Sequence, residues 1–223
     1  MIGKYITEPS KRQKYEFNYD LFSVIDTEEK SYWLGFITAD AYVNHNTLDI
    51  ALKAEDVNHL IAFRKIFIGN VPNIKYKADT NAYRFSVYSV ELCQDLADKG
   101  CIRGKLLRMF PNDTQVPNHL IHHYMRGYFD GDGSIYIDSN SNLRFSVIGS
   151  NHFLDCYEKI LLEHCTRQIT TKRRSQSKIG SDCQEIRYGG NKRCHDIYNF
   201  LYDNANIYLN RKKVVFDYIL MPS

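Results

Sequence analysis

Hydrophobic and polar positions alternate along several short segments of the chain, and each alternating pair of segments is followed by helical spacing. In residues 42–53, Leu48, Ile50 and Leu52 alternate with polar or small residues, which predicts a strand hairpin turning near residues 44–46. Residues 55–68 then place apolar side chains at helical intervals. The same succession recurs from residue 134 onward, so the pattern predicts a duplicated unit.

The predicted elements follow the order helix, two strands, helix, two strands, helix in each copy. We expect four divisions of the chain, namely an N-terminal extension (1–30), a first repeat (31–110), a linker (111–117) and a second repeat (118–223). Beyond the first hairpin and helix, the predicted elements are strands near 74–77 and 84–88, a helix at 90–99, strands at 134–138 and 142–148, a helix at 152–164, strands at 168–174 and 183–188, and a helix at 191–204.

Two segments that precede the hairpins are imperfect copies of one another. Trp33–Ala41 and Met125–Gly133 align at a separation of 92 residues. Each carries small residues at positions i and i+4, which leaves one stripe of the predicted helix without large side chains and lets two such helices approach closely. These helix-interface residues are Gly35, Ala39, Gly127 and Gly131.

An aspartate follows the second small residue of each copy. If the two helices pair along the small residues, Asp40 and Asp132 emerge side by side, where two carboxylates repel unless a positive charge lies between them. A divalent metal ion would supply that charge.

These segments resemble the LAGLIDADG homing endonucleases, in the form in which one chain carries both motifs. The resemblance is strongest from Pro117 to Ile135, clear from Glu29 to Val43, and traceable over residues 17–220. The chain departs from the family pattern where Thr38 replaces the first acid and Ala41 replaces the last glycine.

The resemblance implies an α+β fold of two pseudo-symmetric αββαββα repeats. The motif helices would pair at the centre, and the antiparallel sheets would form a DNA-binding saddle. The implied activity is that of a site-specific endonuclease, which hydrolyses both strands of a long double-stranded DNA target in a metal-dependent reaction and leaves short 3′ overhangs.

The resemblance also assigns roles to residues at the ends of the motif helices. Asp40 and Asp132 would bind Mg²⁺ together with the main-chain carbonyls of Ala39 and Gly131. A lysine beyond the last helix of each repeat would assist the reaction. The matching positions are Lys105 and Lys212, and Lys213 fits the second position equally well.

Two other functions remain open at this stage. An RNA-binding intron maturase could be built on the same fold, and a DNA-binding regulator could keep the fold without cleavage. The presence of aspartate at both 40 and 132 argues against the regulator.

Positive charge is distributed unevenly along the chain. The net charge is only +3, but residues 166–178 contain five cations and no acid. Outward-facing positions of the predicted strands are also basic, and β-ribbons can enter the major groove of DNA. The predicted DNA contacts are Lys53, Lys75, Lys77, Arg84, Arg144, Lys172, Arg174 and Arg187.

The cysteines, the histidines and the distribution of apolar residues limit the classes to which the protein can belong. The six cysteines show no C-x-x-C spacing, which disfavours a zinc site and a disulfide framework. His119, His122 and His123 lack a matching set of ligands, so we interpret them as helix-surface or capping residues. The chain has no long apolar run and no secretory signal pattern, and we expect a monomeric intracellular protein, in the cytoplasm or in a genome-bearing compartment.

Overall fold

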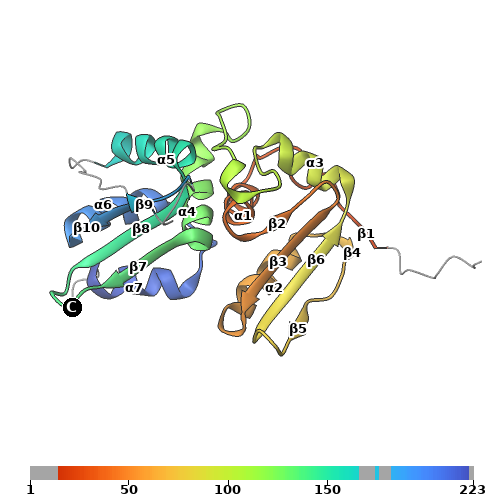
Figure 1. The fold of residues 1–223 in the computed structure, drawn as a ribbon, viewed down its shortest axis with the longest axis horizontal. Helices are drawn as coiled ribbons and strands as arrows, with labels where there is room; N and C mark the ends of the chain where they lie inside the picture. Colours follow the sequence, from red (N-terminus) through yellow and green to blue (C-terminus); the bar gives the residue numbers. More distant parts are fainter. Residues whose placement is uncertain (1–14, 166–173, 176–181, 221–223) are drawn as a thin grey trace, which may run out of the picture.

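The computed structural model of the chain describes residues 15–165, 174–175 and 182–220. These residues form an α+β fold whose two halves face each other across a central pair of helices (Figure 1). We call residues 15–110 the first half and residues 118–220 the second half. The two-repeat architecture predicted from the sequence is confirmed.

The first half contains one four-stranded antiparallel sheet and a separate two-stranded ladder. Its elements are β1 (Glu16–Phe17), α1 (Glu28–Asp40), β2 (Tyr42–Val43), β3 (Thr47–Lys53), α2 (Val57–Lys65), β4 (Gly69–Asn70), β5 (Lys75–Lys77), β6 (Ala82–Tyr88) and α3 (Val90–Asp98). The strands of the larger sheet run in the order β2-β3-β6-β5, and β1 pairs with β4.

The second half repeats this course and adds one helix. Its elements are α4 (Ile121–Asp132), β7 (Gly133–Ile137), β8 (Leu143–Ser150), α5 (Asn151–His164), β9 (Arg174–Ser175), β10 (Cys183–Gly189), α6 (Asn191–Tyr202) and α7 (Asn210–Leu220). The sheet order β7-β8-β10-β9 matches the order in the first half.

Helix α1 is a buried central helix. Thr27 caps its N terminus, where the side-chain oxygen accepts a hydrogen bond from the main-chain N–H of Lys30 (3.3 Å). Every residue from 31 to 39 is buried, which is typical of a helix with no solvent-facing side.

Helices α1 and α4 touch through their main chains. A Cβ built on Gly35 would overlap the carbonyl oxygen of Tyr124, and one built on Gly127 would overlap the carbonyl oxygen of Tyr32. Tyr32 and Tyr124 are themselves 92 residues apart, so the two contacts are made by equivalent positions of the two repeats. The stripe of small residues therefore lies at the helix interface.

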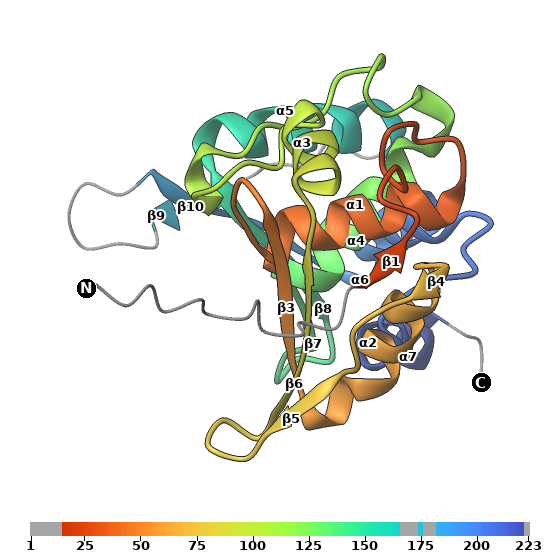
Figure 2. The same ribbon diagram turned by 90° about the vertical axis from the view of Figure 1, so that its right-hand side faces the viewer.

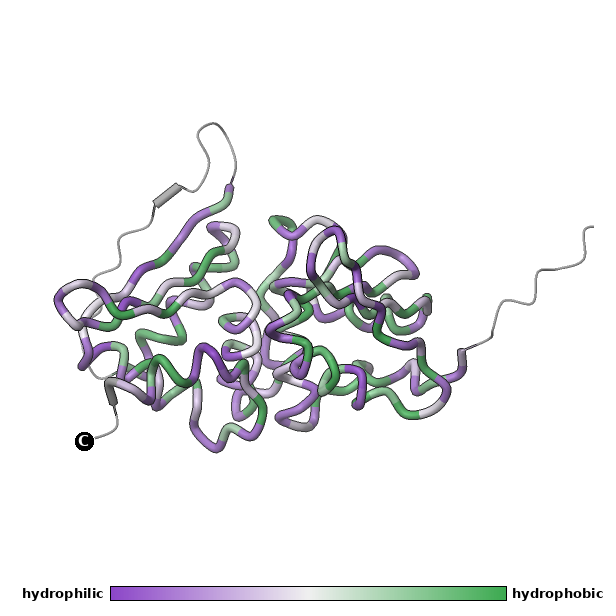
Figure 3. Tube along the Cα trace, turned by 90° about the horizontal axis from the view of Figure 1, so that it is seen from below, coloured by the Kyte–Doolittle hydropathy of each residue, from purple (hydrophilic) through white to green (hydrophobic). Residues whose placement is uncertain are grey.

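Each sheet packs one face against helices and leaves the other face uncovered. In the first half, Leu48, Ile50 and Phe85 point into the core, whereas Arg84 on the adjacent position is exposed. Figure 2 shows α1, α2, α4 and α7 on one side of β3 and β6. Hydrophobic stretches occur in both halves of the tube drawing in Figure 3.

Two helices differ from the sequence predictions. Helix α2 begins at Val57, after a 3₁₀ turn at Ala54–Asp56, and is shorter than the predicted helix at 55–68. Helix α7 was not predicted. Its buried side chains include Lys212 and Phe216, and a lysine inside an apolar stripe obscures the helical pattern. Among the described residues, no helix combines the length and hydrophobicity needed to cross a membrane.

Candidate active site and nucleic-acid interface

Asp40 and Asp132 are the last residues of α1 and α4 and lie at the same end of the central helix pair. A Cβ built on Gly131 would lie 3.3 Å from the Cβ of Asp40, so the two helix ends are adjacent. Burial raises the pKa of both carboxyls. For Asp132 the pKa rises to about 6, and the neighbouring charge of Asp40 contributes to that rise. The structure therefore brings the two predicted acids into electrostatic contact.

Lys105 provides positive charge beside this pair. It begins a 3₁₀ turn (Lys105–Leu107), which follows Gly104 at φ +88°, a backbone conformation that favours glycine. Its Nζ lies 2.5 Å from Oδ1 of Asp132. A lysine of the first half thus faces the acid of the second half.

The chemistry of the two acids fits a divalent cation. Oδ2 of Asp132 is buried and has no hydrogen-bond partner within the described part of the chain, and carboxylate oxygens are preferred ligands of Mg²⁺. The described residues contain no cluster of three or more His, Cys, Asp or Glu side chains that could hold a metal. Main-chain carbonyls, water or phosphate oxygens would therefore have to complete a ligand set around Asp40 and Asp132.

Two buried cations hold the carbonyl ends of α1 and α4. Arg108 donates hydrogen bonds to the carbonyls at positions 37, 38 and 41, at 2.6 to 3.2 Å. Lys212 donates to the carbonyls at positions 129, 130 and 133, at 2.6 to 2.8 Å. The two sets of acceptors are related by the 92-residue offset, so Arg108 and Lys212 are equivalent residues of the two halves.

These cations offset an unfavourable arrangement of charge. The C terminus of a helix carries partial negative charge, and Asp40 and Asp132 add a carboxylate at each end. Neither helix has a basic residue in its own last turn. Arg108 and Lys212 supply the missing charge from segments that are distant in sequence.

The position of Lys212 corrects a prediction from the sequence. Its side chain is 3% exposed, and its ammonium donates to three main-chain carbonyls. An ammonium has three N–H donors, so none remains for a phosphate. Lys213 forms an ion pair with Asp217 one helical turn away (2.7 Å). Lys212 therefore holds the end of α4, and its equivalent is Arg108, which the sequence analysis missed.

We expect Lys212→Met to lower the free energy of unfolding by about 1.5–3 kcal/mol, because it removes a charged donor from three buried carbonyls. Lys213→Met is a matched control on the next residue, where loss of a partly exposed i,i+4 ion pair should cost only about 0.3–0.5 kcal/mol. Urea denaturation of both variants measures the difference. Equal losses would contradict the role assigned to Lys212.

Each acid opens onto a groove across the exposed face of its own sheet. The first groove has a volume of about 430 Å³, and its lining includes Asp40, Asp49 and Arg84. The second groove has a volume of about 800 Å³ and extends from Asp132 to Arg144. The candidate catalytic acids are therefore continuous with the predicted basic faces.

The strand register brings most of the predicted DNA contacts onto these faces. Directly opposed residues of neighbouring strands share a face; Arg84 opposes Lys75, and Ala82 opposes both Lys53 and Lys77. In the second half, Arg144 and Arg187 lie on the face that includes Ser146. Arg174 opposes Glu185 in the register of β9 and β10, and Lys172 lies outside the described residues.

Comparison with solved structures identifies the fold. The I-SmaMI meganuclease bound to uncleaveable DNA aligns with a TM-score of 0.57 and 13% identity, over 84% of this chain and 88% of that chain. The I-SmaMI LAGLIDADG homing endonuclease bound to cleaved DNA gives 0.56 and 12%, over 87% and 88%. The LAGLIDADG homing endonuclease I-GzeII in complex with its DNA target gives 0.55 and 14%, over 87% and 89%. This chain has the LAGLIDADG homing endonuclease fold. No protein-family model and no curated protein sequence matches it.

Within this LAGLIDADG fold, the two motifs differ at the position two residues before the candidate catalytic acid. Asp130 of the second motif is fully buried and accepts hydrogen bonds from the Tyr32 hydroxyl and the Leu209 main-chain N–H, both at 2.7 Å. The first motif has Thr38 there, whose hydroxyl donates to the Leu34 carbonyl of its own helix (2.7 Å). Asp130 therefore ties both motif helices to the start of α7.

A second connection across the LAGLIDADG fold joins the middle of α4 to the first residue of α1. Arg126 has no exposed surface, and it donates to Glu28 of the first half (2.6 Å) and to the carbonyls of Ile207 and Leu201. Glu28 also accepts from the Asn206 main-chain N–H (2.7 Å). These contacts fix the segment that leads into α7 and hence the position of Lys212.

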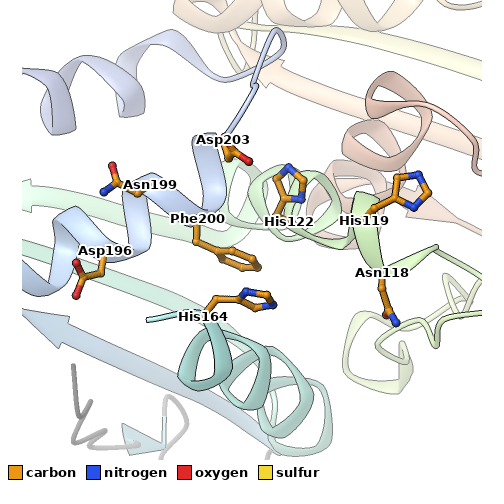
Figure 4. Close-up of a pocket in the computed structure, with 8 residues that line it drawn as sticks. All are labelled: Asn118, His119, His122, His164, Asp196, Asn199, Phe200 and Asp203. Carbon is orange, nitrogen blue, oxygen red and sulfur yellow. The ribbon is translucent and has the colours of Figure 1, made fainter. Parts of the chain in front are cut away.

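A histidine-rich pocket of about 500 Å³ lies near the N-terminal end of α4, whereas Asp132 is the last residue of that helix (Figure 4). His164 stacks on Phe200 with ring centroids 4.4 Å apart, and His122 approaches the same ring at 5.9 Å. The pocket is remote from the two acids, because the 12-residue α4 is roughly 18 Å long. Of the three histidines interpreted from the sequence as helix-surface or capping residues, His119 is exposed, whereas His123 is buried and its Nδ1 lies 2.8 Å from Nη1 of Arg126.

Proposed function

We propose that this protein is a site-specific DNA endonuclease that cleaves both strands of a long duplex target and leaves short 3′ overhangs. The observation that carries the proposal is the placement of two acids at the ends of the paired motif helices, each opening onto a basic groove. The likeness to DNA-bound homing endonucleases supports the choice of duplex DNA as substrate. Because one chain supplies both acids, we propose that it acts as a monomer.

In the proposed mechanism, Asp40 and Asp132 would hold Mg²⁺ with the carbonyls of Ala39 and Gly131. Those two carbonyls are not among the acceptors that Arg108 and Lys212 engage. When bound, a divalent cation activates a water molecule and offsets charge on the departing oxygen.

The residues of the chain itself contribute position and charge. Lys105, at 2.5 Å from Asp132, supplies an ammonium next to the place where a scissile phosphate would lie. Arg108 and Lys212 fix the helix ends that carry the acids. The grooves orient the duplex across both sheets.

The proposal is tested by incubating the protein with a library of duplex targets in Mg²⁺ and sequencing the ends that form. We expect double-strand breaks at one long sequence, with short 3′ overhangs, and no breaks in the presence of EDTA. A protein that binds a structured intron RNA more tightly than any duplex, and cuts none of the library, would instead be a maturase.

A further inference from the structure

Three arginines on the two sheet faces are each held by a neighbouring carboxylate. About half of each arginine side chain is exposed (45–49%), whereas the carboxylate side chains are only 7–16% exposed. We call these three residues the anchored arginines. The pairs are Arg84 with Asp49 (Nε to Oδ2, 2.6 Å), Arg144 with Asp138 (Nη2 to Oδ2, 2.6 Å) and Arg187 with Glu185 (Nη2 to Oε2, 2.5 Å).

Arg144 is positioned through the hairpin turn between β7 and β8. Its Nε donates to Oδ2 of Asp138 (2.8 Å), and its Nη2 lies 2.6 Å from the same oxygen in an ion pair. The other carboxylate oxygen, Oδ1, accepts from the main-chain N–H groups of Asn140 (2.9 Å) and Asn142 (3.0 Å) in the hairpin turn. The turn therefore fixes the carboxylate, and the carboxylate fixes the guanidinium.

Gly189 provides the space that this arrangement needs. It opposes Arg144 in the register of β8 and β10. A Cβ built on Gly189 would overlap Nη1 of Arg144 and would lie 3.3 Å from its Cδ. Since Gly189 does not have a positive φ, alanine would be compatible with the backbone and would displace only the guanidinium.

An anchored arginine differs chemically from a free cation. Guanidinium carries five N–H donors in a planar fork. In Arg144, Asp138 accepts from Nε and pairs with Nη2, which compensates the charge, while donors on Nη1 and Nη2 that point away from Asp138 can form a parallel pair. A parallel pair of donors matches O6 and N7 of guanine in the major groove. Charge compensation at the same time weakens attraction to phosphate.

The exposed lysines of the first sheet present the contrasting case. Lys53, Lys75 and Lys77 are exposed and form no ion pair with any described residue. Their uncompensated ammonium groups suit phosphate contacts, which set affinity without selecting sequence.

We propose that the anchored arginines read guanines of the DNA target. Asp49, Asp138 and Glu185 are then positioning residues, which hold the guanidinium groups in place for base contacts and compensate their charge. The inference rests on the proposed function. It adds a division of labour within the interface, in which acid-paired arginines specify bases and unpaired lysines hold the backbone.

The experiment is a binding selection from a randomised duplex library in Ca²⁺, with the wild type, Asp138→Asn and Gly189→Ala. Asparagine keeps an oxygen for the turn and replaces the oxygen that Arg144 uses. We expect DNA selected by the wild type to contain guanine at one position, whereas DNA selected by either variant should also contain other bases there. The preference for guanine at that position should be reduced roughly 5- to 150-fold in both variants. Gly189→Ala changes no charge, so the DNA affinity of this variant should depend on salt concentration in the same way as the affinity of the wild type.

Lys75→Met is the control for a phosphate contact. It should leave every base preference unchanged and reduce the slope of log affinity against log salt by about one unit. Unchanged base preferences in both Asp138→Asn and Gly189→Ala would overturn the inference while leaving the endonuclease proposal intact. A wild-type protein that selects no duplex would overturn both.

Discussion

Asp132→Asn should abolish double-strand cleavage in Mg²⁺ while keeping the affinity for the same duplex in Ca²⁺. In the proposed mechanism the substitution removes a charged metal ligand at one end of the second groove, and it removes none of the predicted DNA contacts. Loss of several kcal/mol of charge stabilisation corresponds to a rate decrease of roughly 10²–10⁴-fold. Single-turnover cleavage of a selected duplex and a binding titration measure the two quantities.

The same variant carries an internal test of folding. Burial raises the pKa of Asp132 to about 6, above its ordinary value, so an ionised carboxylate at pH 8 lowers the free energy of unfolding. Asparagine removes this cost, and the unfolding temperature at pH 8 without metal should be equal to or higher than that of the wild type. Asp113→Asn, at an exposed position between the halves, should change neither cleavage nor stability. A strong destabilisation by Asp132→Asn would show that the carboxylate is a structural cap.

The features that could be predicted from the sequence are those that repeat along it. The motif segments, the helix pairing at Gly35 and Gly127, and the alternation in β3 and β6 each depend on neighbouring residues or on a 92-residue copy. Local periodicity determines which face of a strand is buried. These signals were sufficient for the fold and for the placement of the two acids.

The features that could not be predicted depend on single contacts between distant segments. Arg108 lies three residues from Lys105, and nothing local distinguishes a buried cap from a cation at the active site. The acceptors of Arg108 and Lys212 lie about 70 and 80 residues away, respectively. The burial of Lys212 lowers its pKa to about 8, yet in the sequence it is one of three consecutive basic residues. Only the folded chain separates these roles.

The carboxylate partners of the anchored arginines were missed for a related reason. Asp49 and Glu185 occupy strand positions where an acid looks like an ordinary solvent-facing residue. For Asp49 the pairing becomes visible only when the register places β3 beside β6. Glu185 lies two residues from Arg187 in the same strand, and their pairing becomes visible only when the side chains are placed on the sheet face. The predicted DNA contacts Arg84 and Arg187 thereby acquire different chemistry from the lysines on the same surface.

Gly127→Ala should cost about 1–3 kcal/mol or more in the free energy of unfolding, although alanine is intrinsically the better helix former. The new Cβ would overlap the main-chain carbonyl of Tyr32, which cannot move without separating α1 from α4. For a chain of this length, each kcal/mol lowers the unfolding temperature by about 2–4 °C. Gly35→Ala should behave in the same way, because it meets the carbonyl of Tyr124.

Gly131→Ala provides a graded comparison at the same interface. Its Cβ would overlap the Cβ of Ala39, a side-chain atom rather than the main chain, and positions 39 and 131 are equivalent in the repeat. Exchanging the two residues in Ala39→Gly/Gly131→Ala should therefore restore most of the stability lost in Gly131→Ala. Ala39→Gly should not rescue Gly127→Ala, since it opens space elsewhere along the helix. Unchanged stability of Gly127→Ala in thermal and urea denaturation would mean that the two motif helices are not in main-chain contact.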